Sequence, residues 1–107
     1  MAEDFESWPR WWRARGEEEL RMILWAGWDP IGRVPRDEYD WYIPRIASLL
    51  REGADEDRLE DELHRDRTEH MGLPPDTRAD GVIAAKLVDW YTNPFYDEDV
   101  RPSELRD

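Results

Sequence analysis

The chain contains no cysteine, which excludes disulfide bonds, iron–sulfur clusters and thiolate zinc sites. It has no apolar run of membrane-spanning length, and its acidic N-terminus lacks the features of a secretory signal, so we expect a cytoplasmic protein. β-Branched residues are few and do not alternate strictly with polar ones, which argues against strands. What remains is helical periodicity in a chain of 107 residues, a length typical of one domain.

Acidic residues are unevenly distributed along the chain, whose formal net charge is −12. Residues 1–53 hold 8 basic and 11 acidic residues, whereas residues 54–107 hold 7 basic and 16 acidic ones. Such a charge repels nucleic acid and anionic membranes and attracts basic proteins. We therefore expect a basic protein partner, with no direct nucleic-acid binding and no membrane association.

The apolar pattern predicts an all-α fold, a compact bundle of three to four short helices with irregular termini. The single domain divides into a Trp-rich N-terminal segment (1–16), a helical core (17–92) and an acidic tail (93–107). Ser7 is a candidate helix cap in the first of these. Within the core, we expect helices over about residues 17–27, 38–52, 56–71 and 78–92.

Particular residues should set the helix ends. Gly16 predicts a break before the first core helix, and Gly27 is expected to end that helix. Asp37 and Asp55 are the expected caps of the second and third helices. Because Pro44 lies deep in the second helix, a start near Tyr42 or a kink remains open.

Two of the predicted helices have well-defined buried faces. The face of the second consists of Tyr39, Tyr42, Ile43, Ile46, Ala47, Leu49 and Leu50. That of the fourth consists of Val82, Ile83, Leu87, Trp90 and Tyr91. The third helix has a thin apolar stripe, Leu59 and Leu63 followed by His70 and Met71, beside a dense acidic face.

The most unusual stretch is the connection between the first two core helices, residues 28–40, which we call the interhelical elbow. Its motif residues are Trp28, Asp29, Pro30, Gly32, Asp37, Tyr39 and Asp40. Asp29 before Pro30 favours a turn, and Gly32 can adopt positive φ. The simpler interpretation is a rigid turn, and the alternative is that the three aspartates converge on a ligand or on a partner's arginine.

The runs Trp28-Asp29-Pro30-Ile31-Gly32 and Asp37-Glu38-Tyr39-Asp40 also carry a family resemblance. Together with residues 49–54 and 70–73, they resemble a small bacterial family of unknown function with a WDPIG turn and a DEYD helix start. The match covers about residues 20–73. The resemblance implies a compact helical fold, a cytosolic location and no established activity.

Two other clusters are candidate partner-binding sites. Trp8, Trp11 and Trp12 share one helical face, where they either fill the core or form an exposed patch. The run from Glu52 to Glu62 holds seven carboxylates against one arginine. From it we select a candidate surface for a basic partner, consisting of Asp55, Glu56, Asp57, Glu60, Asp61 and Glu62. The simpler interpretation is a solvated helix face.

No phosphate loop, hydrolase motif or metal-ligand spacing occurs, so we expect no enzyme, cofactor or metal. The leading hypothesis is a non-enzymatic acidic protein that binds and neutralises a basic partner, as an immunity protein or an inhibitor of a nucleic-acid enzyme does. One alternative is a small-ligand or metal-dependent enzyme centred on Asp29, Asp37, Tyr39, Asp40 and His70. Another is a homodimeric module that associates through the tryptophan cluster.

Overall fold

Residues 8–92, the part of the chain that the computed structural model describes, are built from helices and loops with no strand among them. The predicted all-α bundle is confirmed. The expected Ser7 cap and the acidic tail 93–107 lie outside the described residues.

The first helical segment runs without interruption over residues 8–28. It comprises residues 8–11, the π-helix η1 (Trp12–Gly16), α2 (Glu17–Ile23) and the π-helix η2 (Leu24–Trp28). A loop leads to the 3₁₀-helix η3 (Asp40–Tyr42), which continues into α3 (Ile43–Arg51). Then follow α4 (Glu56–Arg65), its π-helical extension η4 (Asp66–His70) and α5 (Thr77–Thr92).

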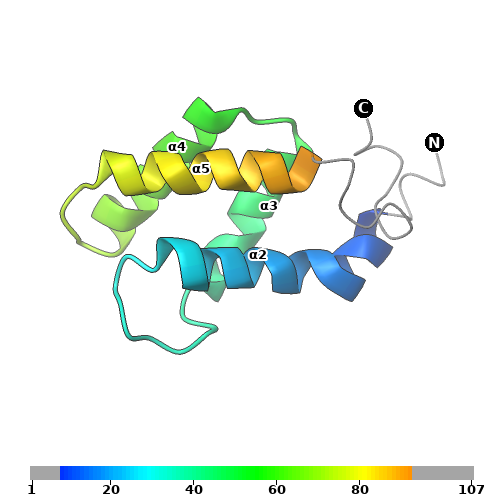
Figure 1. Ribbon diagram of the computed structural model, residues 1–107, viewed down its shortest axis with the longest axis horizontal. Coiled ribbons are helices and arrows are strands. Elements are labelled where there is room, and N and C mark those ends of the chain that lie inside the picture. Colours follow the sequence, from blue (N-terminus) through cyan, green and yellow to red (C-terminus); the bar gives the residue numbers. More distant parts are fainter. Residues whose placement is uncertain (1–7, 93–107) are drawn as a thin grey trace.

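Figure 1 shows how the helices are arranged. The segment 8–28 and α5 run side by side, α3 crosses behind them, and α4 packs along α5. The most extensive helix–helix contact is the one between α4 and α5. Since most helical stability in proteins comes from tertiary packing of an apolar face, contacts between the helices hold the fold together.

Both glycines of the first segment lie within the helix, so the predicted break at Gly16 and helix end at Gly27 are wrong. A Cβ on Gly16 would lie 2.8 Å from ring atoms of Trp11 and Trp12, and one on Gly27 would lie 2.9 Å from Ile83 Cδ1. Close packing therefore explains both residues. The helix ends one residue after Gly27, at Trp28, and the following Asp29 adopts φ 36° while its N–H donates to Leu24 O at 2.8 Å.

Proline determines where α3 begins. The predicted start at residue 38 with Asp37 as cap is wrong, and the alternative start near Tyr42 is confirmed. Pro44 lies in the first turn of α3, where its missing N–H costs nothing. Neither Asp37 nor Glu38 caps the helix through its side chain.

The other predicted helix ends agree with the structure. Asp55 Oδ1 accepts a hydrogen bond from the backbone N–H of Arg58 at 2.9 Å, as expected of an N-cap. Gly53 has φ 89° after α3, and its N–H donates to Leu50 O at 3.0 Å. Gly72 has φ 69° after η4. These ends depend only on neighbouring residues, which is why local patterns find them.

The core is aliphatic between the helices and aromatic toward the ends of the first segment and α5. Its buried members include Leu20, Leu24, Ile43, Ile46, Leu49, Leu50, Leu59, Leu63, Ile83 and Leu87. Val82, predicted on the buried face of α5, is instead exposed, and Asp80 and Ala84 lie on that face. His70 of the third predicted stripe is also exposed.

Candidate functional site

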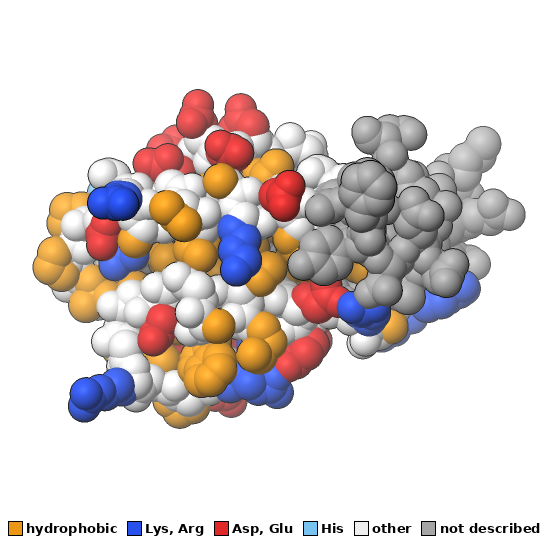
Figure 2. Space-filling model, in the orientation of Figure 1, with side chains coloured by type: hydrophobic (Ala, Val, Ile, Leu, Met, Phe, Trp, Pro, Cys, Tyr) orange, Lys and Arg blue, Asp and Glu red, His pale blue; other side chains and the backbone are white. Residues whose placement is uncertain are grey.

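The acidic face of α4, defined here by Asp55, Glu56, Asp57, Glu60 and Asp61, is the most distinctive surface of the described chain. Four of these side chains are exposed and Glu60 is half-buried. Acidic side chains gather at the upper edge of the molecule, over the N-terminal end of α4 (Figure 2). Glu62 does not belong to this surface, because it is only 7% exposed.

Several acidic residues of α2 are paired with arginines, whereas those of the acidic face are not. Glu17 and Glu18 form salt bridges with Arg21, and Glu18 also pairs with Arg36. The Glu19 carboxylate accepts from Arg15 at 2.8 Å. Within residues 8–92, no salt bridge joins any carboxylate of the acidic face to an arginine or lysine. These carboxylates therefore face solvent without a salt bridge from this part of the chain, although Arg58 lies among them.

The tryptophan cluster is part of the core, so the interpretation of these residues as core filling is confirmed for Trp8 and Trp11. Trp11 is 2% exposed, and its ring centroid lies 5.8 Å from that of Trp90. Trp8 is also buried, and its Nε1 donates to the Tyr91 hydroxyl at 2.8 Å. Trp12 is half-buried and stacks on Trp8 at 5.3 Å. The exposed patch that the partner-binding and homodimer hypotheses required of Trp8 and Trp11 is absent.

The interhelical elbow is held by a hydrogen-bond network centred on Asp29. Its Oδ1 accepts from the Tyr39 hydroxyl at 2.7 Å and from Gly32 N–H at 3.1 Å. The Tyr39 oxygen in turn accepts from Ile31 N–H at 3.0 Å. Burial, followed by the hydrogen bond to Asp29, raises the pKa of Tyr39 to about 12. Gly32 adopts φ 82°, as predicted, and half-buried Pro30 follows Asp29 in the turn.

The remaining residues of the elbow have separate structural partners. Trp28 Nε1 donates to Asp80 Oδ1 at 2.8 Å, which ties η2 to α5. Arg21 donates from Nε to Asp40 Oδ1 at 2.8 Å and thereby ties the elbow to α2. Asp37 is exposed. Asp29 thus stabilises the turn, Asp40 forms a salt bridge and Asp37 is exposed. This is the arrangement expected of a rigid turn.

The residues of the hypothetical enzyme site are divided between two places. His70 lies on η4, where its Nδ1 is 3.0 Å from Asp66 Oδ1, whereas Asp29 and Tyr39 hydrogen-bond to each other in the elbow. Among residues 8–92, no three histidine or acidic side chains are placed to hold a metal ion. The geometry therefore gives the elbow residues structural roles.

Two buried polar clusters were not predicted from the sequence. Arg67 donates from Nη2 to Asp80 Oδ1 at 2.9 Å, and both side chains are almost completely buried. Glu62 and Asp66 are buried one helical turn apart on the inner face of α4 and η4. Helical spacing could have revealed them, since Asp80 precedes Ile83 by three residues and Glu62 follows Leu59 by three.

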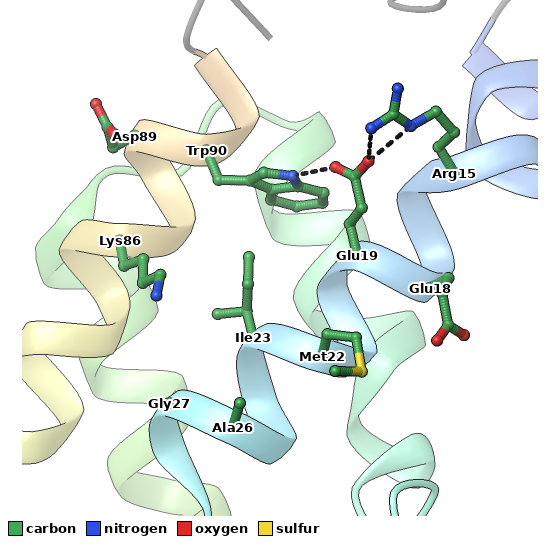
Figure 3. Close-up of a pocket in the computed structure, with 10 residues that line it drawn as sticks. All are labelled: Arg15, Glu18, Glu19, Met22, Ile23, Ala26, Gly27, Lys86, Asp89 and Trp90. Atoms are coloured by element: carbon green, nitrogen blue, oxygen red, sulfur yellow. Dashed lines mark hydrogen bonds and ion pairs between the residues drawn. The ribbon is translucent and has the colours of Figure 1, made fainter. Parts of the chain in front are cut away.

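A groove of about 580 Å³ lies between the first helical segment and α5. Its apolar part includes Met22, Ile23, Ala26 and Trp90, and Lys86 and Asp89 border it on α5. Figure 3 shows the Glu19 carboxylate between Arg15 and Trp90, and Trp90 Nε1 donates to it at 2.6 Å. The charges at this end of the groove are therefore paired within the molecule, in contrast to the acidic face.

No protein-family model matches this sequence, and searches of curated proteins and of solved structures found no match either. The resemblance to the family with the WDPIG turn stays a prediction. None of the helices within residues 8–92 has the length and apolar character needed to cross a membrane.

Proposed function

We propose that this protein is a non-enzymatic, cytoplasmic binding protein that docks on a basic partner protein and inhibits or neutralises it. The observation that supports the proposal is the acidic face of α4, whose carboxylates have no salt-bridge partner within residues 8–92. A surface of this kind gains most from a partner that supplies the missing cations. An immunity protein against a toxin nuclease and an inhibitor of a nucleic-acid enzyme both belong to this class.

Charge would act mainly on the rate of association and on the choice of partner. A net charge of −12 steers a basic protein toward the acidic face and repels nucleic acid. Exposed charge pairs each contribute little to affinity, so apolar or aromatic contacts are needed to slow dissociation. Trp8 and Trp11 cannot supply these contacts, because they are buried.

The test is affinity capture from the native host with two variants of equal charge. The first variant is Glu56→Gln/Asp57→Asn/Asp61→Asn, which neutralises three exposed carboxylates of the acidic face. The matched control is Glu17→Gln/Glu18→Gln/Glu69→Gln, since these carboxylates lie within 4 Å of arginines. We expect the wild type and the control to capture a basic protein, and the first variant to lose it.

The affinity of the captured partner for the wild type should also fall steeply as salt increases from 50 to 300 mM, because screening weakens exposed charges. A partner that is acidic, or one whose affinity is unaffected by both salt and the α4 substitutions, would refute the proposal.

A further inference from the structure

Trp41 is the exception among the tryptophans of the described chain. Its side chain is 83% exposed, whereas Trp8, Trp11, Trp28 and Trp90 are all buried. Single exposed apolar residues are common, but exposing nearly a whole indole leaves a large apolar area in water. Trp41 is also by far the most exposed of the large hydrophobic side chains within residues 8–92.

The backbone of residues 35–42 explains why this side chain points outward. Three hydrogen bonds of 3₁₀ type follow one another, from Glu38 N–H to Pro35 O, from Asp40 N–H to Asp37 O and from Tyr42 N–H to Tyr39 O, at 3.0–3.1 Å. In this geometry, residues three apart lie on the same edge. The segment therefore has three edges.

Two of the edges contact the rest of the fold. Tyr39 is buried and Tyr42 packs against the core, so their edge faces inward. Asp40 lies on the second edge, where it accepts from Arg21. The third edge consists of Pro35, Glu38 and Trp41, all of which are exposed. We call it the Trp41 edge.

The Trp41 edge combines an aromatic face with a carboxylate. A guanidinium group stacks on tryptophan and can also pair with a carboxylate through its planar fork. Within residues 8–92, no salt bridge occupies Glu38, and neighbouring Arg36 is held by Glu18. Trp41 and Glu38 are thus available to a cation from outside this part of the chain.

We propose that the Trp41 edge binds an arginine side chain of the basic partner, with the guanidinium over the Trp41 indole and paired with Glu38. This inference rests on the proposed function and identifies the aromatic anchor that it requires. The acidic face of α4 attracts the partner, and Trp41 provides the contact that must break before the partner dissociates.

A fluorescein-labelled nona-arginine peptide is a suitable probe, with binding measured by fluorescence anisotropy at 50 mM salt. Trp41→Ala should weaken binding about 3- to 30-fold, the range expected from losing a cation–π contact, and Glu38→Gln should weaken it about 2- to 5-fold, the range expected from losing an exposed ion pair. Val82→Ala and Glu69→Gln are matched controls, because they remove an exposed apolar side chain and an exposed carboxylate elsewhere. Thermal unfolding establishes that the variants keep their fold.

A second measurement locates the peptide directly. In a proton–nitrogen NMR spectrum, the indole resonance of Trp41 should shift on titration more than those of Trp8, Trp11 and Trp90. A nona-lysine peptide should bind the wild type more weakly than nona-arginine, because an ammonium group is attracted to the ring only as a point charge and lacks the planar stacking and forked pairing of a guanidinium.

The outcomes separate this inference from the proposed function. If Trp41→Ala and Glu38→Gln bind the peptide as the wild type does, while the triple α4 variant loses it, the acidic binding function stands and the Trp41 edge is ruled out. If the wild type itself does not bind the peptide at low salt, both are refuted.

Discussion

The buried pair Glu62 and Asp66 makes stability depend on pH in a direction opposite to that of most carboxylates. Asp66 is 1% exposed, and its Oδ1 lies 3.0 Å from His70 Nδ1. Glu62 Oε1 lies 3.5 Å from Arg45 Nε. Burial, followed by the hydrogen bond and the charge of Glu62, raises the pKa of Asp66 to about 8. At neutral pH, Asp66 therefore carries a proton that it can donate to Glu62.

The sign of the effect follows from the two states. Asp66 has a pKa near 4 in the unfolded chain, so between about pH 4 and pH 8 the folded state binds one proton more than the unfolded state does. This contribution to stability is full below pH 4 and is lost as the pH rises toward 8. One proton corresponds to about 1.4 kcal/mol per pH unit.

Asp66→Asn isolates this contribution, because the amide has nearly the same shape, can donate to Glu62 and does not titrate. The free energy of unfolding of the variant minus that of the wild type should increase with pH. The expected slope is at most about 1.4 kcal/mol per pH unit, or about 3 kcal/mol between pH 5 and pH 7. Titrating groups that do not contact Asp66 are common to both proteins and largely cancel.

Urea denaturation followed by circular dichroism at pH 5, 6 and 7 measures this difference. Asp61→Asn is the matched control, since Asp61 is an exposed aspartate on the same helix and should show no such slope. A difference between Asp66→Asn and the wild type that is constant across pH 5–7 would show that Asp66 is ionised in the folded protein, which would refute the reasoning.

Three further substitutions test the packing by urea denaturation. Arg67→Ala should destabilise by about 3–5 kcal/mol because it leaves the buried Asp80 carboxylate without its cation, and a loss below 1 kcal/mol would contradict this. Tyr39→Phe should cost about 1–2 kcal/mol through loss of its hydrogen bonds to Asp29 and to the backbone, an estimate contradicted by an unchanged midpoint. Gly16→Ala should destabilise by about 1–3 kcal/mol although alanine favours helices, because two tryptophan rings occupy the space of the new methyl group. An increase in stability for Gly16→Ala would mean that these rings can move aside.

Helix ends show where local reasoning succeeds. Asp55 accepts a hydrogen bond from the N–H three residues along the chain, and Gly53 and Gly72 adopt positive φ next to the helices that they end. These outcomes depend on the residue's own chemistry and its near neighbours. The apolar stripes of the core helices are predictable for the same reason, because a spacing of three or four residues defines a face before any packing occurs.

Glycine within the first helical segment shows where local reasoning fails. Gly16 and Gly27 have the residue type of a helix end, yet both lie inside the helix because ring atoms of two tryptophans and a methyl group of Ile83 leave no room for a side chain. Asp37 similarly resembles a cap, but the position of Pro44 and the burial of Tyr39 place the start of α3 further along the chain. In each case, a contact that local patterns do not contain decides the outcome.

The candidate surfaces, too, could be predicted only in part from the sequence. Composition alone identified the acidic run that becomes the acidic face of α4, since charge density is a property of the chain. Composition could not show that Glu62 is buried while Asp61 is exposed, or that Trp11 lies in the core while Trp41 lies in solvent. Which side of a helix or turn faces the core depends on what packs against it.

The sequence by itself therefore determined the helical class, most helix positions and the acidic character of the protein, because propensity, periodicity and charge are local. Only the tertiary structure decided which polar groups pair across the fold. Trp8 meets Tyr91 across 83 residues of chain, and Arg67 meets Asp80 across a turn between helices. Such pairs form where packing excludes water. The same packing buries Trp8 and Trp11 and leaves Trp41 exposed to solvent.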